Sequence, residues 1–303
     1  MMEKIEEIGD VEERYEVLHQ VGDGGQADLH LGRERATNRK VALKIQKPWG
    51  HESMMYFTEI GKALEKEGSR TRLLAGIPQV PDLIATGHYR NRRCLVLEFV
   101  EGRLLHDVLT SARPVRDTST VASVIGQLCE ILHAVHRKRL VHCDLKPENV
   151  MVEPNGRIRL LDMGFAIRMR TPTEWSRGTI GYMPPEQFDR NPFGLTREAD
   201  IFALGCMLLE MTVMRLPYAG SEGRPALGCS VPVLPPDRLA ALPVEFAPLA
   251  LHMVERKAAH RPAHVREVFA ALRPYVPAPG SRRPLKPLRP DPTEHYRTHP
   301  PTL

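Results

Sequence analysis

Cysteine is scarce in this sequence, and the few cysteines are not arranged in pairs. No two of them form a C-x-x-C motif, and their number is odd: Cys94, Cys129, Cys143, Cys206 and Cys229. Disulfide-stapled scaffolds need an even set of cysteines, and structural zinc sites need closely spaced ligands. The pattern therefore excludes both classes, predicts reduced thiols and favours a cytoplasmic protein.

Long apolar runs are also missing. A helix that crosses a bilayer needs roughly 18 or more apolar residues in a row, and the best candidate, residues 201–214, is interrupted by Glu210. The first ten residues are charged and contain no apolar core, which does not match a secretory signal peptide. We therefore expect no membrane insertion.

Charges of the two signs are nearly balanced. The 42 Lys and Arg residues exceed the 37 Asp and Glu residues by five, and three of these five excess positive charges lie within residues 274–303, together with nine prolines. The remaining chain is close to neutral, whereas a nucleic-acid-binding surface is usually basic. We expect no nucleic-acid partner, and we expect residues 273–303 to form a basic, Pro-rich and disordered tail.

The 303 residues are enough for two lobes with sizeable cores. Residues 15–47 alternate apolar and polar positions around glycine turns, which predicts strands, and one helix is expected over about 52–68. After a short apolar strand at 94–100, the periodicity becomes helical. The first helix of this part is expected to be capped by Thr118, and later helices are expected at about 198–214, 243–256 and 263–272.

The most specific pattern is Leu140-Val141-His142-Cys143-Asp144-Leu145-Lys146-Pro147-Glu148-Asn149-Val150. It sets a carboxylate, an ammonium group and a carboxamide at fixed spacing between two apolar runs, which suits phosphoryl transfer to a hydroxyl. The run resembles the H-R-D-L-x-x-x-N catalytic loop of protein kinases, and its Lys-Pro-Glu is similar to the serine/threonine branch. The resemblance implies that Asp144 is the catalytic base, that Lys146 neutralises the travelling phosphoryl group, and that Asn149 is a metal ligand.

Two further motifs lie in the part expected to be rich in strands. Residues 22–29, Gly-Asp-Gly-Gly-Gln-Ala-Asp-Leu, resemble the kinase G-x-G-x-x-G-x-V loop, with alanine replacing the third glycine and leucine replacing the valine. Glycines there let backbone N–H groups approach phosphates. Residues 41–44, Val-Ala-Leu-Lys, resemble the V-A-I-K motif, in which the lysine binds the α- and β-phosphates.

Lys44 of this second motif needs an acidic partner on the following helix. We choose Glu59, because Phe57 and Ile60 flank it and would face the core; Glu52 and Glu65 are competitors. In the family, Leu97 would gate the pocket behind the adenine, and 98–100 would form the hinge. The implied nucleotide-binding residues are Gly22, Gly24, Gly25, Ala27, Leu29, Ala42, Lys44, Glu59, Leu97, Glu98 and Val100.

A metal site is implied by Asp162-Met163-Gly164, which resembles the D-F-G motif with methionine for phenylalanine. It lies eighteen residues after Asp144. The family uses this aspartate together with the catalytic-loop asparagine, so Asp162 and Asn149 are expected to hold Mg²⁺ between the β- and γ-phosphates. Mn²⁺ is an alternative ion.

Several positions are expected to support the site rather than to react. Residues 178–186 resemble the end of the kinase activation segment, with proline replacing the alanine of A-P-E. In the family, Glu186 would pair with a distant arginine, here Arg261. Asp200 would brace the catalytic loop through backbone N–H groups, and Thr179 would place a structural hydroxyl near that loop.

One residue of the catalytic loop departs from the pattern. Cys143 replaces an arginine whose charge, in kinases that have it, requires a phosphate on the activation loop. Because a cysteine is neutral at pH 7 unless its pKa is perturbed, we predict a weak dependence of activity on phosphorylation of Thr171, Thr173 or Ser176. Cys143 is either a buried inert thiol, which we favour, or an oxidation-sensitive switch.

These motifs follow one another in the family's order, over about residues 15–272. The resemblance identifies a eukaryotic-like (Hanks-type) serine/threonine protein kinase and favours a bacterial one. It implies an α+β, two-lobed protein kinase fold: a small antiparallel β-sheet lobe with one helix (about 15–100) and a larger, mainly helical lobe (about 101–272), with a head at 1–14. The implied cofactors are ATP and Mg²⁺, and the implied partners are protein substrates.

Two other classes remain open. A nucleotide-binding pseudokinase would act as a scaffold, although retention of Lys44, Asp144, Asn149 and Asp162 argues against it. An adaptor would work through the Pro-rich tail by docking on a Pro-binding module; an inert linker fits that stretch at least as well.

Overall fold

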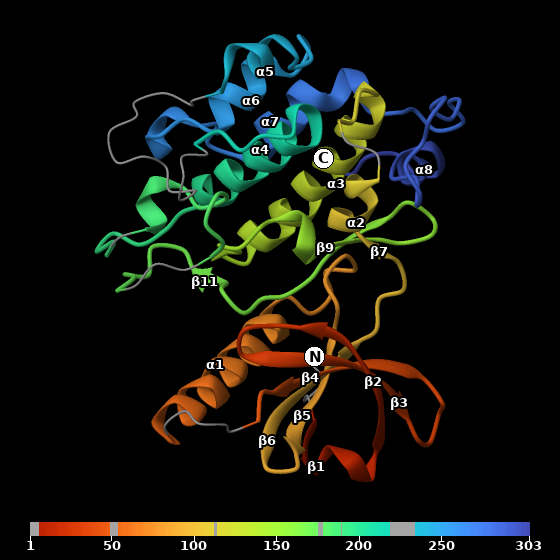
Figure 1. Ribbon diagram of the computed structural model, residues 1–303, viewed down its shortest axis with the longest axis vertical. Coiled ribbons are helices and arrows are strands. Elements are labelled where there is room, and N and C mark those ends of the chain that lie inside the picture. Colours follow the sequence, from red (N-terminus) through yellow and green to blue (C-terminus); the bar gives the residue numbers. More distant parts are fainter. Residues whose placement is uncertain (1–5, 49–53, 112–113, 175–177, 189, 219–233) are drawn as a thin grey trace. The chain divides into compact units, whose positions relative to one another are not determined.

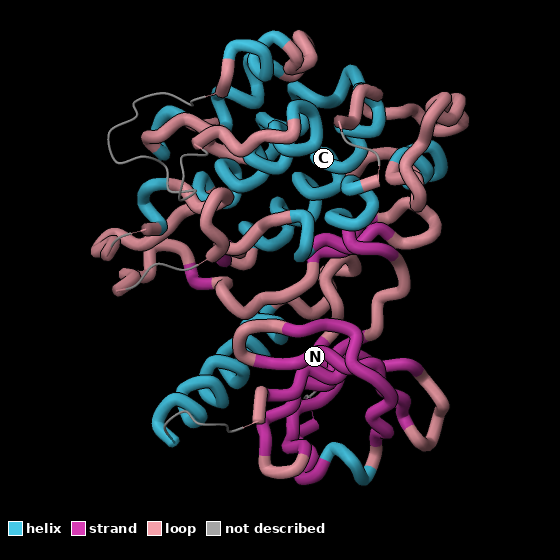
Figure 2. Tube along the Cα trace, in the orientation of Figure 1, coloured by secondary structure: helices cyan, strands magenta, loops and turns pink. Residues whose placement is uncertain are grey.

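A computed structural model of the chain describes residues 6–48, 54–111, 114–174, 178–188, 190–218 and 234–303. The chain divides after Val100 into two units, residues 1–100 and 101–303, at the boundary that the sequence predicts. We call them the small lobe and the large lobe. Figure 1 labels their elements, and Figure 2 separates strands, which dominate the small lobe, from helices, which dominate the large lobe.

The small lobe is built on a six-stranded sheet with the strand order β1-β5-β6-β4-β3-β2. Strands β2 to β6 pair antiparallel, as expected. The head contributes β1, which pairs parallel with β5, so the sheet is mixed rather than purely antiparallel. The strands are β1 (Glu6–Asp10), β2 (Tyr15–Asp23), β3 (Ala27–Glu34), β4 (Lys40–Gln46), β5 (Leu83–Tyr89) and β6 (Arg92–Glu98), with a 3-10 turn η1 (Val11–Glu13) after β1.

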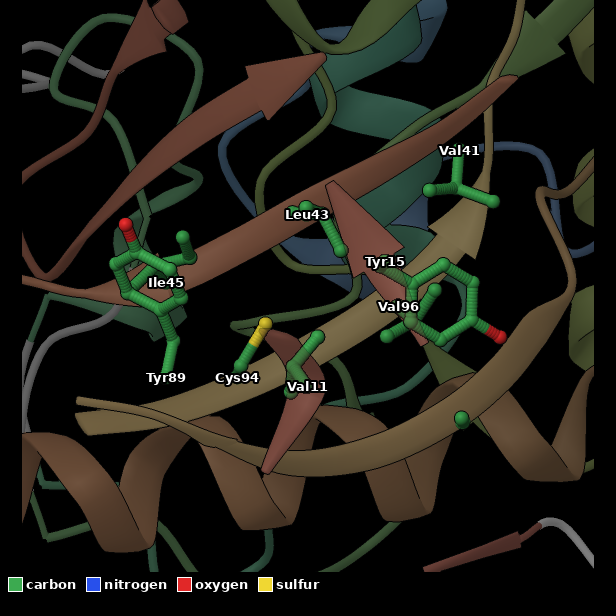
Figure 3. Packing of buried hydrophobic residues seen from close by; sticks show 9 residues of the cluster. Val11, Tyr15, Val41, Leu43, Ile45, Tyr89, Cys94 and Val96 are labelled. Carbon is green, nitrogen blue, oxygen red and sulfur yellow. The ribbon is translucent and has the colours of Figure 1, made fainter. Parts of the chain in front are cut away.

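The side chains of β4 alternate between the two faces of the sheet, and one of these faces packs into the core of the small lobe. Val41, Leu43 and Ile45 are buried in one cluster with residues of the neighbouring strands (Figure 3). Burying an aliphatic side chain of this size contributes about 1.5–3 kcal/mol. Because side chains of a strand alternate between its two faces, Ala42 and Lys44 lie on the opposite face. The cluster thus fixes which β4 residues face away from it.

The one helix of the small lobe, α1 (Met54–Leu73), extends five residues beyond its predicted end. Its buried positions form a stripe at helical spacing: Ile60, Leu64, Glu67, Gly68 and Thr71. A Cβ added at Gly68 would lie 3.0 Å from the Leu95 side chain on β6, so this glycine permits the close approach of helix and sheet.

The large lobe is mainly helical and carries two small sheets, β10-β9-β7 and β11-β8. Its strands are β7 (Arg103–Leu104), β8 (Leu140–Val141), β9 (Val150–Val152), β10 (Ile158–Leu160) and β11 (Ile167–Arg168). Its α-helices are α2 (Leu105–Thr110), α3 (Thr118–Arg137), α4 (Glu198–Val213), α5 (Pro236–Ala240), α6 (Ala247–Met253), α7 (Val265–Leu272) and α8 (Thr293–Thr298). Short 3-10 helices are η2 (Pro147–Asn149), η3 (Pro185–Gln187), η4 (Ala258–His260) and η5 (Arg273–Tyr275).

Helix α3 is the central helix of the large lobe, and fifteen of its twenty residues are buried. Its N-cap is Asp117 rather than Thr118: the Asp117 carboxylate accepts hydrogen bonds from the Thr120 N–H at 2.7 Å and from the Ser119 hydroxyl at 2.5 Å. By length and composition α3 is apolar enough to cross a bilayer, but 78% of its most apolar window is buried inside the lobe, as in a core helix.

The prediction of a disordered tail is wrong, because residues 276–303 pack on the large lobe and include α8. Tyr296 is completely buried, and Leu288 is 5% exposed. The Gln127 amide on α3 donates to the Pro292 carbonyl at 3.1 Å, and Arg103 donates to the Arg289 carbonyl at 3.1 Å. The composition of the tail predicted disorder, but a few buried side chains and hydrogen bonds attach it to the lobe. The tail is therefore a structural part of the lobe.

Candidate active site

The glycine turn of the small lobe connects β2 and β3. Gly22 pairs with Leu29 across the two strands, and the Gly24 N–H donates to the Ala27 carbonyl at 3.1 Å. A Cβ added at Gly24 would lie 2.8 Å from that carbonyl oxygen, whereas one added at Gly25 would meet nothing within 4 Å. Glycine is thus required at 24 for the turn itself.

Ala27, which replaces the third glycine of the motif, is 4% exposed. It belongs to an apolar cluster with Leu64, Leu83 and Leu95, and Leu97 packs against that cluster. Its methyl group therefore ties the turn to α1 and to the sheet.

Four of the expected nucleotide-binding residues lie on one face of the sheet. Lys44 pairs with Leu29 on β3, and Ala42 pairs with Leu97 on β6. Cross-strand partners in an antiparallel pair point to the same face, and this face is the one opposite to the cluster in Figure 3. The expected hinge begins at Glu98, the last residue of β6, whose N–H donates to the Asp82 carbonyl at 2.9 Å.

The acidic partner of Lys44 is Glu67, so the choice of Glu59 is wrong. The Lys44 ammonium lies 2.7 Å from a Glu67 carboxylate oxygen, and the two side chains are 17% and 6% exposed. Glu59 instead pairs with Lys62 at 2.9 Å on the exposed side of α1. The buried stripe of α1 explains this outcome, since Glu67 follows Ile60 by seven residues and belongs to that stripe, whereas Glu59 does not.

The catalytic loop of the large lobe holds Asp144 in a network of three side chains. Asn149 donates to one Asp144 carboxylate oxygen at 2.9 Å, and the Thr179 hydroxyl donates to the other at 2.7 Å. Lys146 donates to the same Thr179 hydroxyl at 2.6 Å and lies 3.4 Å from the Asp144 carboxylate. The Asp144 side chain is 7% exposed. The structure thus brings together Asp144, Lys146 and Asn149, as the sequence predicts, and Thr179 lies among them.

Asp200 holds the backbone of this loop by hydrogen bonds, as expected. Its two carboxylate oxygens accept hydrogen bonds from the backbone N–H groups of His142 at 2.9 Å and Cys143 at 3.0 Å. His136 on α3, which sequence reasoning missed, lies 2.8 Å from the same carboxylate. Burial opposes ionisation of Asp200, but the His136 hydrogen bond and the backbone donors hold its pKa below the usual value.

Cys143 has a backbone conformation that is uncommon for a residue with a side chain, with φ of 68°. Both of its backbone polar groups are bound by side chains. Its N–H donates to Asp200, and its carbonyl accepts from the Gln187 amide at 2.6 Å. A Cβ added at Gly178 would lie 2.5 Å from this carbonyl oxygen, so only glycine fits there. Gln187 was not expected as a support.

The Cys143 side chain lies in an apolar cluster and is not part of a disulfide. The residue is 5% exposed, and its buried neighbours in the cluster are Val141, Ile167, Leu195 and Ala199. A thiol in such surroundings is a small apolar side chain with little access to oxidants. The cluster supports the inert role that we favoured for this cysteine.

The β9–β10 hairpin brings together the two expected metal ligands. Val150 pairs with Leu160 in the antiparallel ladder, so Asn149, just before β9, and Asp162, just after β10, lie at the same end of the hairpin. The Leu161 N–H donates to the Asn149 carbonyl at 2.8 Å. Because the Asn149 amide nitrogen makes both of its hydrogen bonds to Asp144, its side-chain oxygen is the atom left for a metal ion.

These two oxygen donors fit a hard cation such as Mg²⁺, which binds through one or two protein oxygens and keeps phosphates and waters as further ligands. Asp162 has φ of 54°, and one of its carboxylate oxygens accepts from the Gly164 N–H at 2.8 Å. Met163 is 2% exposed and fills an apolar position. Within the described residues, no cluster of three or more His, Cys, Asp and Glu side chains suits a metal ion.

The expected pair of Glu186 and Arg261 is present and bidentate. The two N···O distances are 2.6 and 3.0 Å. Arg261 is fully buried, donates to three backbone carbonyls as well, and lies 4.9 Å from the ring centre of Phe202. A buried guanidinium needs this many partners to offset its lost hydration. This pair anchors the end of the activation segment.

The activation segment is also held by its backbone. β11 pairs with β8, immediately before the catalytic loop. Thr173 exchanges two backbone hydrogen bonds with Asn191, at 2.9 and 3.0 Å, and is 6% exposed. Thr171 is exposed, and Ser176 lies outside the described residues. Of the expected phosphorylation candidates, Thr173 is therefore not accessible in this conformation.

Known proteins with similar sequences belong to the family that the motifs resemble. The protein kinase domain family matches residues 15–230. The serine/threonine-protein kinase pkn2 of Myxococcus xanthus is 31% identical over 302 aligned residues, which cover 88% of this chain and 35% of that protein. The serine/threonine-protein kinase PrkC of Bacillus subtilis is 27% identical over 215 residues, which cover 69% of this chain and 32% of that protein.

The chain thus spans about a third of the length of these two bacterial relatives. Another relative, serine/threonine-protein kinase 36 of Pongo abelii, is 28% identical over 211 residues, which cover 68% of this chain and 15% of that protein. The family match covers more than half of the chain and agrees with the resemblance read from the motifs. The chain belongs to the protein kinase domain family and has its two-lobed fold, with serine/threonine kinases of bacteria among its relatives.

Proposed function

We propose that this chain is a protein serine/threonine kinase that transfers the γ-phosphate of ATP to hydroxyl groups of protein substrates. The observation that carries the proposal is the contact of the Thr179 hydroxyl with both Asp144, at 2.7 Å, and Lys146, at 2.6 Å. An aliphatic hydroxyl can therefore meet the carboxylate and the ammonium group at the same time. A substrate serine or threonine needs these same two contacts when its hydroxyl receives the phosphoryl group.

Each group of this network has a role that its chemistry supports. The Asp144 carboxylate accepts the proton of the substrate hydroxyl as the oxygen attacks phosphorus. The Lys146 ammonium group lies where it can neutralise charge on the phosphoryl group. Asn149 holds the Asp144 carboxylate in place through its amide N–H group. Attack in line with the leaving oxygen inverts the configuration at phosphorus.

The small lobe supplies the residues proposed to bind the nucleotide. The face that carries Leu29, Ala42 and Leu97 offers apolar contact for an adenine, and the glycine turn offers backbone N–H groups for phosphates. The Glu67 carboxylate holds Lys44, which we assign to the α- and β-phosphates. Asn149 and Asp162 would hold Mg²⁺, which neutralises phosphate charge when bound; Mn²⁺ suits the same oxygen donors.

Activity should depend only weakly on phosphorylation of the activation segment. The surroundings of Cys143 support this proposal, because the residue that would otherwise be a cation needing a phosphate is a neutral side chain in an apolar cluster. The backbone pairing of Thr173 with Asn191 and the bond between Glu186 and Arg261 hold the described part of the segment without a phosphate.

The proposed partners are protein substrates, and the proposed compartment is the cytoplasm, where the buried cysteines would stay reduced. Docking of the tail through Leu288 and the Arg289 carbonyl favours a structural role over capture by a Pro-binding module. Exposed Leu285 and Lys286 leave a short stretch for such a module to reach.

Autophosphorylation with labelled ATP tests the function directly. We expect incorporation into serine or threonine by the wild-type chain with Mg²⁺, and a loss of at least a hundredfold in the Asp144→Asn variant, since general-base catalysis typically contributes about 10²–10⁴-fold. Arg282→Gln, at an exposed tail position, is a control for charge loss. Equal labelling of wild type and Asp144→Asn would refute the assignment of the base, and nucleotide binding without any transfer would identify a pseudokinase.

A further inference from the structure

A pocket of about 400 Å³ in the large lobe collects basic side chains that the proposed reaction does not use. α3 contributes His133, His136 and Arg137, Arg197 precedes α4, and His264 and Arg266 lie at the start of α7. Three arginines and three histidines thus surround one space. The carboxylate among the lining residues is that of Glu267.

The positive charge of this pocket is not balanced by ion pairs. Within the described part of the chain, none of Arg137, Arg197 and Arg266 lies within 4.0 Å of a carboxylate oxygen. Arg197 instead contacts the His264 ring, at 3.3 Å for one of its nitrogens. Glu267 accepts a hydrogen bond from the Ala263 N–H at 3.4 Å, at the start of α7. Burial and the neighbouring Arg266 and Arg137 lower the pKa of His133, as expected where cations crowd together.

One of the residues that line the pocket, His136, also has a buried polar atom without a partner. The His136 side chain is 6% exposed, and among the described residues its buried Nδ1 atom has no hydrogen-bond partner. Buried polar groups are nearly always paired, so an unpaired one needs an explanation. Its other ring nitrogen, Nε2, lies 2.8 Å from the Asp200 carboxylate, so the same ring belongs both to the lining of the pocket and to the support of Asp200.

His136 also connects the pocket to the catalytic loop. The Asp200 oxygen that contacts His136 accepts the His142 N–H at 2.9 Å, and the second oxygen accepts the Cys143 N–H at 3.0 Å. A change in the position or charge of the His136 ring therefore acts on the carboxylate that holds the backbone next to Asp144. Coupling between two sites requires such a shared element.

We propose that this pocket binds a phosphate monoester group, and that the bound phosphate acts on the catalytic loop through His136 and Asp200. Arginine forks bind phosphate oxygens in bidentate fashion, and a dianion matches several cations better than a carboxylate does. The volume leaves room for the group that carries the phosphate. That carrier is either a small phosphorylated molecule or a phosphorylated side chain of a protein. The binding site itself does not rest on the proposed kinase function.

Calorimetric titration of the full chain tests the site, with phenyl phosphate as the small probe and a short phosphoserine peptide as the protein-like probe. We expect saturable binding of at least one probe, and a roughly tenfold weaker affinity in Arg197→Gln and in Arg266→Gln, as for the loss of one charge-assisted contact. Arg282→Gln removes the same charge at an exposed tail position and should bind as the wild type does. Tighter binding of the peptide would assign the phosphate to a protein, and tighter binding of phenyl phosphate to a small molecule.

Failure of both probes to saturate the wild type below roughly 10 mM, or equal affinity in all three variants, would overturn the site. The coupling has its own readout, the amide NMR shifts of His142 and Cys143 without ATP. We expect these shifts to move with phosphate in the wild type. They should stay fixed in His136→Gln, with the thermal midpoint showing that this variant is folded. Binding that leaves both amides unchanged in the wild type would refute the coupling, and because no ATP is present, an inactive kinase would not affect either result.

Discussion

Replacing Glu67 with glutamine should destabilise the small lobe, whereas the same replacement of Glu59 should not. Glu67 is 6% exposed and its carboxylate lies 2.7 Å from the Lys44 ammonium, which is itself 17% exposed. Glu59 and Lys62 also lie 2.9 Å apart, but they are 62% and 56% exposed. The two pairs therefore share one chemistry and differ in burial, which makes Glu59→Gln a matched control.

The size of the effect follows from burial. A hydrogen bond to a charged group contributes about 1.5–3 kcal/mol, and removing one partner of a buried ion pair costs about 3–5 kcal/mol because the other charge remains. A glutamine oxygen can still accept from Lys44, so we expect the lower range, about 2 kcal/mol. Exposed pairs contribute little because water screens them, so Glu59→Gln should leave the free energy of unfolding unchanged.

Urea unfolding, followed by tryptophan fluorescence and by circular dichroism, measures both variants. A double-mutant cycle with Lys44→Met isolates the interaction of Lys44 with Glu67, since the two residues are in direct contact. Nucleotide affinity should fall in Glu67→Gln, because Lys44 loses the group that holds it. The reasoning would be wrong if Glu59→Gln cost as much as Glu67→Gln, or if the cycle gave no coupling.

Three further results are expected. Alanine at Thr171, Thr173 and Ser176 together should retain most of the kinase activity, and a loss beyond tenfold in a peptide phosphorylation assay would contradict the role given to Cys143. Tyr296→Ala should lower the free energy of unfolding by about 3 kcal/mol, as for a buried aromatic side chain; Leu285→Ala, at a fully exposed position, should leave the melting temperature unchanged. Burial, then His299 and Arg157, lower the pKa of His295 to about 4, so between pH 6.5 and 4 the unfolded chain binds a proton that the native chain does not. The contribution of His295 to stability should be constant above pH 6.5 and fall as the pH is lowered to 4. The melting temperature should therefore fall less in His295→Asn than in the wild type over this range. Identical pH profiles of the melting temperature in the two proteins would refute the role of His295.

The order and nature of the motifs predicted most of the fold and much of the site. Asp200, Thr179 and the pair of Glu186 with Arg261 lie where the sequence predicts, because each belongs to a short motif whose neighbours limit its position. Helix α4 was expected at 198–214 and spans Glu198–Val213. Its mainly apolar run contains Glu210 but no proline that would end the helix early.

The choice of Glu59 failed for a physical reason. It rested on two flanking apolar residues, whereas a helix buries a stripe at spacings of three and four. Extending the stripe from Ile60 through Leu64 leads to position 67, so the signal was present in the sequence. The helix was also expected to end at about 68, whereas it continues to Leu73, so Glu67 lies well inside it.

The tail failed for a different reason. Proline content describes the average preference of a segment, but docking depends on single side chains and on partners far away in the sequence. Gln127 bonds the Gly156 carbonyl, the Pro292 carbonyl and the Ile158 N–H, so one α3 side chain joins the β9–β10 hairpin to the tail. No local pattern indicates such a contact, since its members are 29 and 165 residues apart from Gln127.

Cys143 and His136 together suggest where control of the catalytic loop resides. An arginine at 143 would bring a cation into the loop, and a phosphate on the activation segment would then be needed to balance it. With cysteine there, the loop is fixed through its backbone by Asp200 and Gln187, and neither contact involves the activation segment's phosphorylation candidates. The side chain that contacts the Asp200 carboxylate is His136, which lines the basic pocket. A phosphate there would act on the same loop from the side of α3, and it would give a kinase that depends only weakly on phosphorylation of its activation segment another input of the same chemistry.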